Sequence, residues 1–147
     1  MLTYWKVASL GVLGLMCSAQ ASLAQSPKSS ESINVPADQV PYKDVGIGKL
    51  QLGTVWGDSS KGAYGAFLRI PAGFVSPVHL HTGDYYAVVV EGTVVNFEEG
   101  HPEILLGPGS YFFQRGKIDH VTKCVSNTDC LFYMSQSQSS DFIIRKK

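Results

Sequence analysis

The sequence predicts an all-β protein, a sandwich or barrel built from many short strands. Short apolar and β-branched runs recur from Val35 onward, and glycine, proline, asparagine and aspartate separate them. This pattern is typical of strands joined by tight turns. No long stretch of the same region repeats its apolar residues at the helical period. Together, these two observations favour a closed or stacked β-sheet architecture over a helical one.

The composition is that of one globular domain. The chain has 147 residues, a formal net charge of zero and 44% hydrophobic residues. This length favours a single domain, and the hydrophobic content is too high for a disordered chain. The one basic run is Arg145–Lys147, so we expect no nucleic-acid partner.

The first residues have the features of an export signal. Lys6 supplies a positive charge, and the apolar run Val7–Cys17 that follows is too short to remain as a membrane anchor. Small residues then allow cleavage after Ala24, with Ala21 as the alternative. We therefore expect a periplasmic or secreted protein that leaves the membrane once the signal is removed. The expected segments are a signal peptide over 1–24, a flexible linker over 25–34 and a β-barrel domain over 35–147.

The strands are predicted from apolar or alternating runs between turn residues. The expected ranges are Gly48–Val55, Ala63–Ile70, Val78–His81, Tyr85–Val90, Thr93–Phe97, Glu103–Leu106, Ser110–Gln114, Ile118–Lys123, Leu131–Gln136 and Phe142–Ile144.

Two cysteines would remain after export, Cys124 and Cys130, and the residues between them are typical of a hairpin turn. Cysteines that flank such a turn can face each other at bridging distance, so we expect a disulfide in an oxidising compartment. The alternatives are two reduced buried thiols, or one cysteine that acts as a metal ligand.

The chemistry of the chain centres on three histidines. His79 and His81 are two residues apart in an expected strand, so their side chains share one face. His120 lies in another expected strand, and a barrel would turn both faces inward. Three neutral imidazoles suit zinc, copper, iron or nickel. We therefore expect a divalent transition metal, which should bind more weakly below about pH 6 as free imidazoles protonate.

The spacing around these histidines resembles the cupin superfamily. The first cupin signature is matched by Gly73-x5-His79-x-His81-x3-Tyr85-x6-Gly92, and the second in part by Gly109-x10-His120. In the second signature, Arg115, Lys117 and Cys124 stand where the family pattern has proline, glycine and asparagine. The stretch from Trp56 to Tyr85 also resembles a group of small, mostly uncharacterised bacterial cupins. The resemblance implies a conical jelly-roll barrel with a metal inside its mouth, and often a homodimer.

Tyr85 occupies the position at which the cupin pattern has a glutamate ligand. A neutral phenol has a pKa of about 10 and is a poor ligand. In the first of three alternatives, the histidines bind metal alone and the Tyr85 hydroxyl contacts whatever else binds there. In the second, Asp84 replaces the carboxylate, which would require a strand bulge. In the third, the site binds no metal. Strand alternation favours the first.

Five further side chains lie in segments near the expected pocket. Gln114 is a candidate polar group beside the second signature. Arg69 could pair with a carboxylate substrate, although a solvated strand residue is the more ordinary expectation. We expect Trp56 and Phe67 to pack in the core or at its rim, and His101 to be exposed and non-ligating.

Two functions follow from these residues. The first is an enzyme whose three-histidine metal site acts on a small organic molecule, similar to the three-histidine dioxygenases among cupins, with Tyr85 as its catalytic side chain. The second is a non-catalytic periplasmic module that binds a metal or a small ligand. Open coordination positions favour the enzyme, whereas the lack of an obvious general base favours the binding module.

Overall fold

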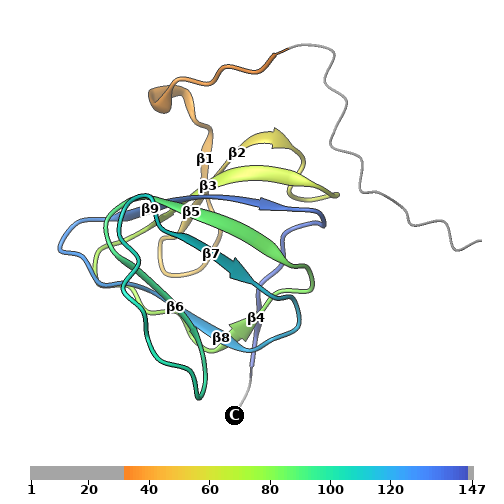
Figure 1. Ribbon diagram of the computed structural model, residues 1–147. Helices are drawn as coiled ribbons and strands as arrows, with labels where there is room; N and C mark the ends of the chain where they lie inside the picture. The colour runs from red at the N-terminus through yellow and green to blue at the C-terminus, as the bar shows by residue number, and fades with distance from the viewer. Residues whose placement is uncertain (1–31, 146–147) are drawn as a thin grey trace, which may run out of the picture.

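The computed structural model describes residues 32–145, and nearly all regular structure within them is β-strand (Figure 1). The elements in chain order are the 3-10 turn η1 Ala37–Gln39 and the strands β1 Tyr42–Asp44, β2 Gln51–Gly57, β3 Tyr64–Ile70, β4 His79–Leu80, β5 Tyr85–Glu91, β6 Val94–Glu98, β7 Tyr111–Gln114, β8 His120–Cys124, β9 Cys130–Gln136 and β10 Ile143–Ile144. No helix in this range is long and apolar enough to cross a membrane. The expected signal peptide and most of the expected linker lie outside the described residues.

The strands form two antiparallel sheets that face each other (Figure 1). The larger sheet has the order β1-β2-β3-β9-β5-β7, and the smaller has the order β10-β4-β8-β6. From β4 to β10, consecutive strands alternate between the two sheets, as in a jelly roll. The interior therefore receives side chains from both sheets: β4 and β8 supply one wall, and β3, β5 and β9 supply the other.

Alternation along the strands builds the core. On β5, Tyr85, Ala87 and Val89 are buried, whereas the residues between them face solvent. Apolar side chains of β3 and β9, among them Ala66 and Phe132, complete the same cluster. The all-β prediction rested on alternation of apolar and polar residues, and burial along β5 alternates in the same way.

The predicted strand Glu103–Leu106 is wrong. Its last three residues are apolar, but Leu105 is 70% exposed and the segment forms no strand. Only Leu106 pairs, through two backbone hydrogen bonds with Val94 at 2.8 and 2.9 Å. The apolar run predicted a strand, yet a single bridge to β6 is all the pairing that it makes.

Two other differences lie near the start of the fold. The strand expected from Gly48 begins only at Gln51, because Gly48 and Lys49 have φ angles of +52° and +62° that turn the chain. Strand β1 was not predicted. It is three residues long and follows Pro41, which is too short to show an alternating pattern.

The expected disulfide forms between the two sheets. Cys124 ends β8 and Cys130 begins β9, with their sulfur atoms 2.02 Å and their Cα atoms 5.7 Å apart. Both residues are buried. Because both sulfur atoms are in the bridge, neither cysteine is a free thiol or a metal ligand in this structure.

Candidate metal centre

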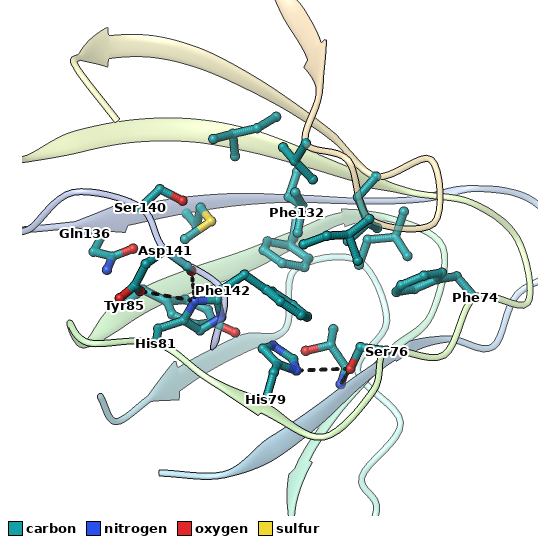
Figure 2. Close-up of a pocket in the computed structure, with 18 of the residues that line it drawn as sticks. Phe74, Ser76, His79, His81, Tyr85, Phe132, Gln136, Ser140, Asp141 and Phe142 are labelled. Atoms are coloured by element: carbon teal, nitrogen blue, oxygen red, sulfur yellow. Dashed lines mark hydrogen bonds and ion pairs between the residues drawn. The ribbon is translucent and has the colours of Figure 1, made fainter. Parts of the chain in front are cut away.

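Three histidines from two segments of the chain converge inside the barrel. His79 on β4 lies directly opposite His120 on β8 in the antiparallel register. His81 follows two residues after His79 and turns its ring to the same side, as Figure 2 shows for this pair. The ring centroids are 4.2 Å apart for His79 and His120, 5.0 Å for His79 and His81, and 5.3 Å for His81 and His120. One nitrogen of each ring lies within 4.8 Å of the others.

Main-chain carbonyls orient all three rings. The Nδ1 atoms of His79 and His120 lie 2.9 and 3.0 Å from the carbonyl oxygen two residues earlier in the chain. Nδ1 of His81 is hydrogen-bonded to the carbonyl oxygen of Asp141. A carbonyl oxygen can only accept, so each Nδ1 carries the proton and each Nε2 keeps its lone pair. Metal-ligating histidines typically have such partners on the nitrogen that does not bind the metal.

One of these Nε2 atoms has no partner of its own. His120 is 1% exposed, and its Nε2 is buried without a hydrogen bond. An unsatisfied buried polar atom is costly, and native structures contain few of them. Three convergent imidazole lone pairs are a donor set that zinc, copper, iron and nickel accept. The residues present therefore fit a divalent transition metal.

Burial keeps the imidazoles neutral. It lowers the pKa of His79 to about 3 and that of His120 to about 4, and the charge of a neighbouring histidine adds to the effect. Burial also lowers the pKa of His81. All three rings are consequently neutral at pH 7, which is the form that binds metal. Unperturbed imidazoles would lose metal below about pH 6, as they become protonated. Because the pKa values are lowered here, we expect metal binding to weaken only at a lower pH.

Tyr85, and not Asp84, faces the histidines. Tyr85 is buried, and its ring centroid lies 5.3 Å from that of His81. Asp84 is exposed, and its carboxylate accepts a 2.6 Å hydrogen bond from the amide of Gly116. The alternative in which Asp84 supplies the missing ligand therefore has no support in the geometry. Burial raises the pKa of Tyr85 well above its ordinary value, so this side chain stays a neutral hydrogen-bonding group.

The segment around β10 completes the site, and sequence reasoning missed its contribution. The phenyl ring of Phe142 stacks on the ring of His79, with centroids 3.9 Å apart and planes inclined by 15°. The carboxylate of Asp141 accepts hydrogen bonds from the backbone amide and the hydroxyl of Thr82. The hydrogen bond from the amide is 2.9 Å long. Asp141 lies 60 residues from His81 in the chain. No local motif marks either residue, so only the pairing of β10 with β4 reveals them.

A cavity of about 250 Å³ lies beside the histidines. Its walls are mostly apolar, and most of the polar groups lie on one side, with Ser76 near Phe74 as an exception (Figure 2). Figure 2 shows His81, Tyr85 and Gln136 close together, with Phe132 and then Phe74 at increasing distance from them. The cavity thus has a polar part next to the candidate metal site and an apolar part beyond it.

Two of the considered polar side chains do not line this cavity. Gln114 is buried, but it accepts a 2.7 Å hydrogen bond from Asn96 and donates a longer one, of 3.4 Å, to Glu98. Arg69 lies on the other face of β3, with its guanidinium 4.9 Å from the centroid of the Tyr42 ring. The suggested role of Arg69 in binding a carboxylate substrate therefore has no support in the geometry.

The remaining side chains lie as expected. Trp56 donates a 2.7 Å hydrogen bond to the hydroxyl of Tyr133, and Phe67 packs edge-on against the Tyr133 ring at 5.4 Å. These contacts place both residues in packing, on the face of the larger sheet that points away from the cavity. His101 is exposed, away from the other histidines.

Solved structures that resemble this fold include cupins and a protein with a double-stranded β-helix domain, which confirms the expected cupin fold. The polyketide cyclase RemF from Streptomyces resistomycificus superposes with a TM-score of 0.66 at 14% identity, over 80% of this chain and 87% of that one. An RmlC-like cupin from Shewanella frigidimarina has a TM-score of 0.59 at 22% identity, over 75% and 95%. The DMSP lyase DddQ from Ruegeria pomeroyi has a TM-score of 0.55 at 17% identity, over 76% and 56%. At these identities the likeness concerns the fold alone.

A family model described as a domain of unknown function, DUF4437, matches residues 46–145. No curated protein matches the chain. The matched range covers more than half of the 147 residues and includes the three histidines, Tyr85 and the disulfide. The chain therefore belongs to the DUF4437 family, and its fold is that of a cupin.

Proposed function

We propose that this protein is an exported cupin that holds one divalent transition metal, zinc, iron or copper, through His79, His81 and His120. The protein would use this metal to bind, or to act on, a small organic molecule in the cavity that His79 and His81 line. One observation carries the proposal. Three Nε2 lone pairs converge from rings that main-chain carbonyls hold in place, and one of these atoms is buried without a partner.

The arrangement supports chemistry at the metal. A divalent ion held by three neutral imidazoles supplies a Lewis acid with open coordination positions. The cavity is lined by His79 and His81, and also by Tyr85 as a buried phenol. Tyr85 would position the bound molecule by hydrogen bonding, and its buried ring would exclude water from that part of the cavity wall. Two structures that superpose on this fold are a polyketide cyclase and a DMSP lyase. If this protein is an enzyme, we favour an oxygenase-like reaction.

A second candidate is a binding module without turnover. Asp141 is the one carboxylate among the described residues that line the cavity, and its oxygens are hydrogen-bonded to Thr82. The high pKa of Tyr85 also makes that phenol a reluctant proton donor. The cavity wall therefore offers no free general base, which favours binding alone over proton-transfer chemistry.

Export is supported by the disulfide between Cys124 and Cys130, because such bonds persist in oxidising compartments. Outside the cytosol, zinc and copper bind imidazole sites more tightly than iron does. Loading in that compartment therefore favours zinc or copper, whereas an oxygenase would need a redox-active metal such as iron or copper.

Elemental analysis of protein purified from the compartment to which it is exported tests the proposal. We expect about one equivalent of metal in the wild type and in His101→Ala, the exposed control, and none in His79→Ala. Far-UV circular dichroism would show whether the variant has folded, and His120→Gln provides a second variant. Equal metal contents in wild type and both folded variants would refute the metal site. Oxygen uptake by metal-loaded protein with β-dicarbonyls, thiols and aromatic acids would separate the enzyme from the binding module.

A further inference from the structure

The cavity differs chemically between its two parts. The part next to the candidate metal site carries His81, Tyr85 and Gln136 (Figure 2). The part beyond it is formed mainly by aliphatic and aromatic side chains, including Ile47, Leu68 and Phe74. Ser76 lies beside Phe74 in this part, and its hydroxyl oxygen already accepts a 3.0 Å hydrogen bond from the amide of Thr122. A ligand that fills both parts must have one polar end and an apolar body.

The cavity wall, as far as the described residues form it, also lacks positively charged side chains. No lysine or arginine lines the cavity among residues 32–145, and Arg69 packs on the opposite face of its strand. The positive charge available to a ligand is therefore that of the proposed metal, whose three ligands are neutral. The carboxylate of Asp141, 3.9 Å from Nδ1 of His81, offsets one of its two charges. An anionic oxygen would be stabilised there, whereas a second anionic group in the apolar part would be desolvated without a partner.

The volume limits the size of the ligand. A cavity of about 150 Å³ lined by apolar side chains holds one benzene molecule. By the same measure, the cavity of about 250 Å³ accommodates about ten non-hydrogen atoms. This is the size of one substituted ring or of a medium-chain aliphatic acid, and it is too small for a nucleotide or a disaccharide.

We propose that the ligand of this cavity is a small monoanion with an apolar, ring-sized body, whose single oxygen group points to the three histidines. This inference rests on the proposed metal site and adds the ligand class to it. The aromatic walls at Phe74, Phe132 and Phe142 suit a planar ring better than a flexible chain. Dicarboxylates, sugars and phosphate esters are excluded by the uncharged apolar part.

Calorimetric titration of the metal-loaded protein tests the ligand class. The probes are cinnamate, a monoanion with one ring, and adipate, a dicarboxylate of similar size. We expect cinnamate to bind at least tenfold more tightly than adipate, because adipate would bury a second carboxylate without a partner. The metal content of every sample is measured alongside.

Two variants narrow the apolar part without touching the histidines. Leu68→Trp fills it from β3, and Ile47→Trp fills it from the loop that precedes β2. Each should weaken cinnamate binding at least tenfold and leave the metal content unchanged. Val88→Trp is the matched control, because Val88 lies on the exposed face of β5. This variant should bind cinnamate as tightly as the wild type does.

The outcomes separate the two proposals. Metal-loaded protein that binds adipate as tightly as cinnamate, or binds cinnamate equally well in both narrowed variants, would overturn the ligand class and leave the metal site standing. Wild-type protein that holds no metal, yet binds cinnamate in a way that depends on Leu68, would overturn both the orientation of the ligand and the proposed function.

Discussion

The buried histidines should make the metal-free protein unusually sensitive to mild acid. In the folded chain the pKa values of His79 and His120 fall to about 3 and about 4, against an ordinary value of 6.5. Between pH 6.5 and about pH 4 the unfolded chain therefore binds protons that the folded chain does not. Stability must then decrease as the pH falls, because protonation favours the unfolded state.

The size of the effect follows from the two shifts. Each histidine contributes a slope of about 1.4 kcal/mol per pH unit in this window. At pH 5 each has removed about 2 kcal/mol relative to pH 7, so the pair removes about 4 kcal/mol. His81, whose pKa is also lowered, acts in the same direction. A loss of this size is a large share of the total stability of a small domain, which is typically about 5–15 kcal/mol.

Urea unfolding in the presence of a chelator at pH 7, 6 and 5 measures this loss. His120→Gln should remove about half of the slope contributed by the pair, whereas His101→Gln should leave it unchanged because His101 is exposed. Saturating zinc should flatten the pH dependence down to the pH at which protons displace the metal. A metal-free protein that is equally stable at pH 7 and pH 5 would refute the burial of neutral imidazoles.

Three further predictions concern groups around the site. Asp84→Asn should change metal affinity by less than about twofold, whereas loss of a residue that supports a ligand typically costs tenfold or more; competition with a zinc chelator measures this. Replacing Cys124 and Cys130 by alanine should lower the free energy of unfolding by about 2 kcal/mol, because the bridge closes a short loop; a chemical melt that shows no loss would contradict it. Phe142→Ala should remove about 1 kcal/mol of ring stacking and raise the pKa of the neighbouring histidine, which an NMR titration follows; Phe142→Leu should retain most of the cover.

Strand alternation accounts for most of what the sequence could predict. The period of two placed His79 and His81 on one face and separated Tyr85 from Asp84, and the structure has both arrangements. The turn residues between Cys124 and Cys130 predicted a tight turn that brings these cysteines together, which the structure has. The turn joins β8 to β9 of the opposite sheet, however, and not two paired strands of a hairpin. Such predictions succeed because they depend on backbone geometry within one strand or one turn.

The parts that could not be predicted depend on contacts between distant segments. Asp141 and Phe142 reach the histidines only because β10 pairs with β4. Their local sequence carries no sign of that pairing. Arg69 shows the converse case, because alternation allowed either face and only the fold placed its guanidinium over Tyr42. The run Glu103–Leu106 had strand composition without a strand to pair with beyond one bridge.

The position of the disulfide separates the joint between the two sheets from the candidate metal ligands. Cys124 and His120 lie at opposite ends of β8, and the bridge ties the smaller sheet to the larger one at the Cys124 end. His79 and His120 belong to the smaller sheet and His81 directly follows β4, while Tyr85 begins β5 of the larger sheet. The pairing of His79 with His120 is thus internal to one sheet. The space between the histidines and Tyr85 depends instead on how the two sheets are held together.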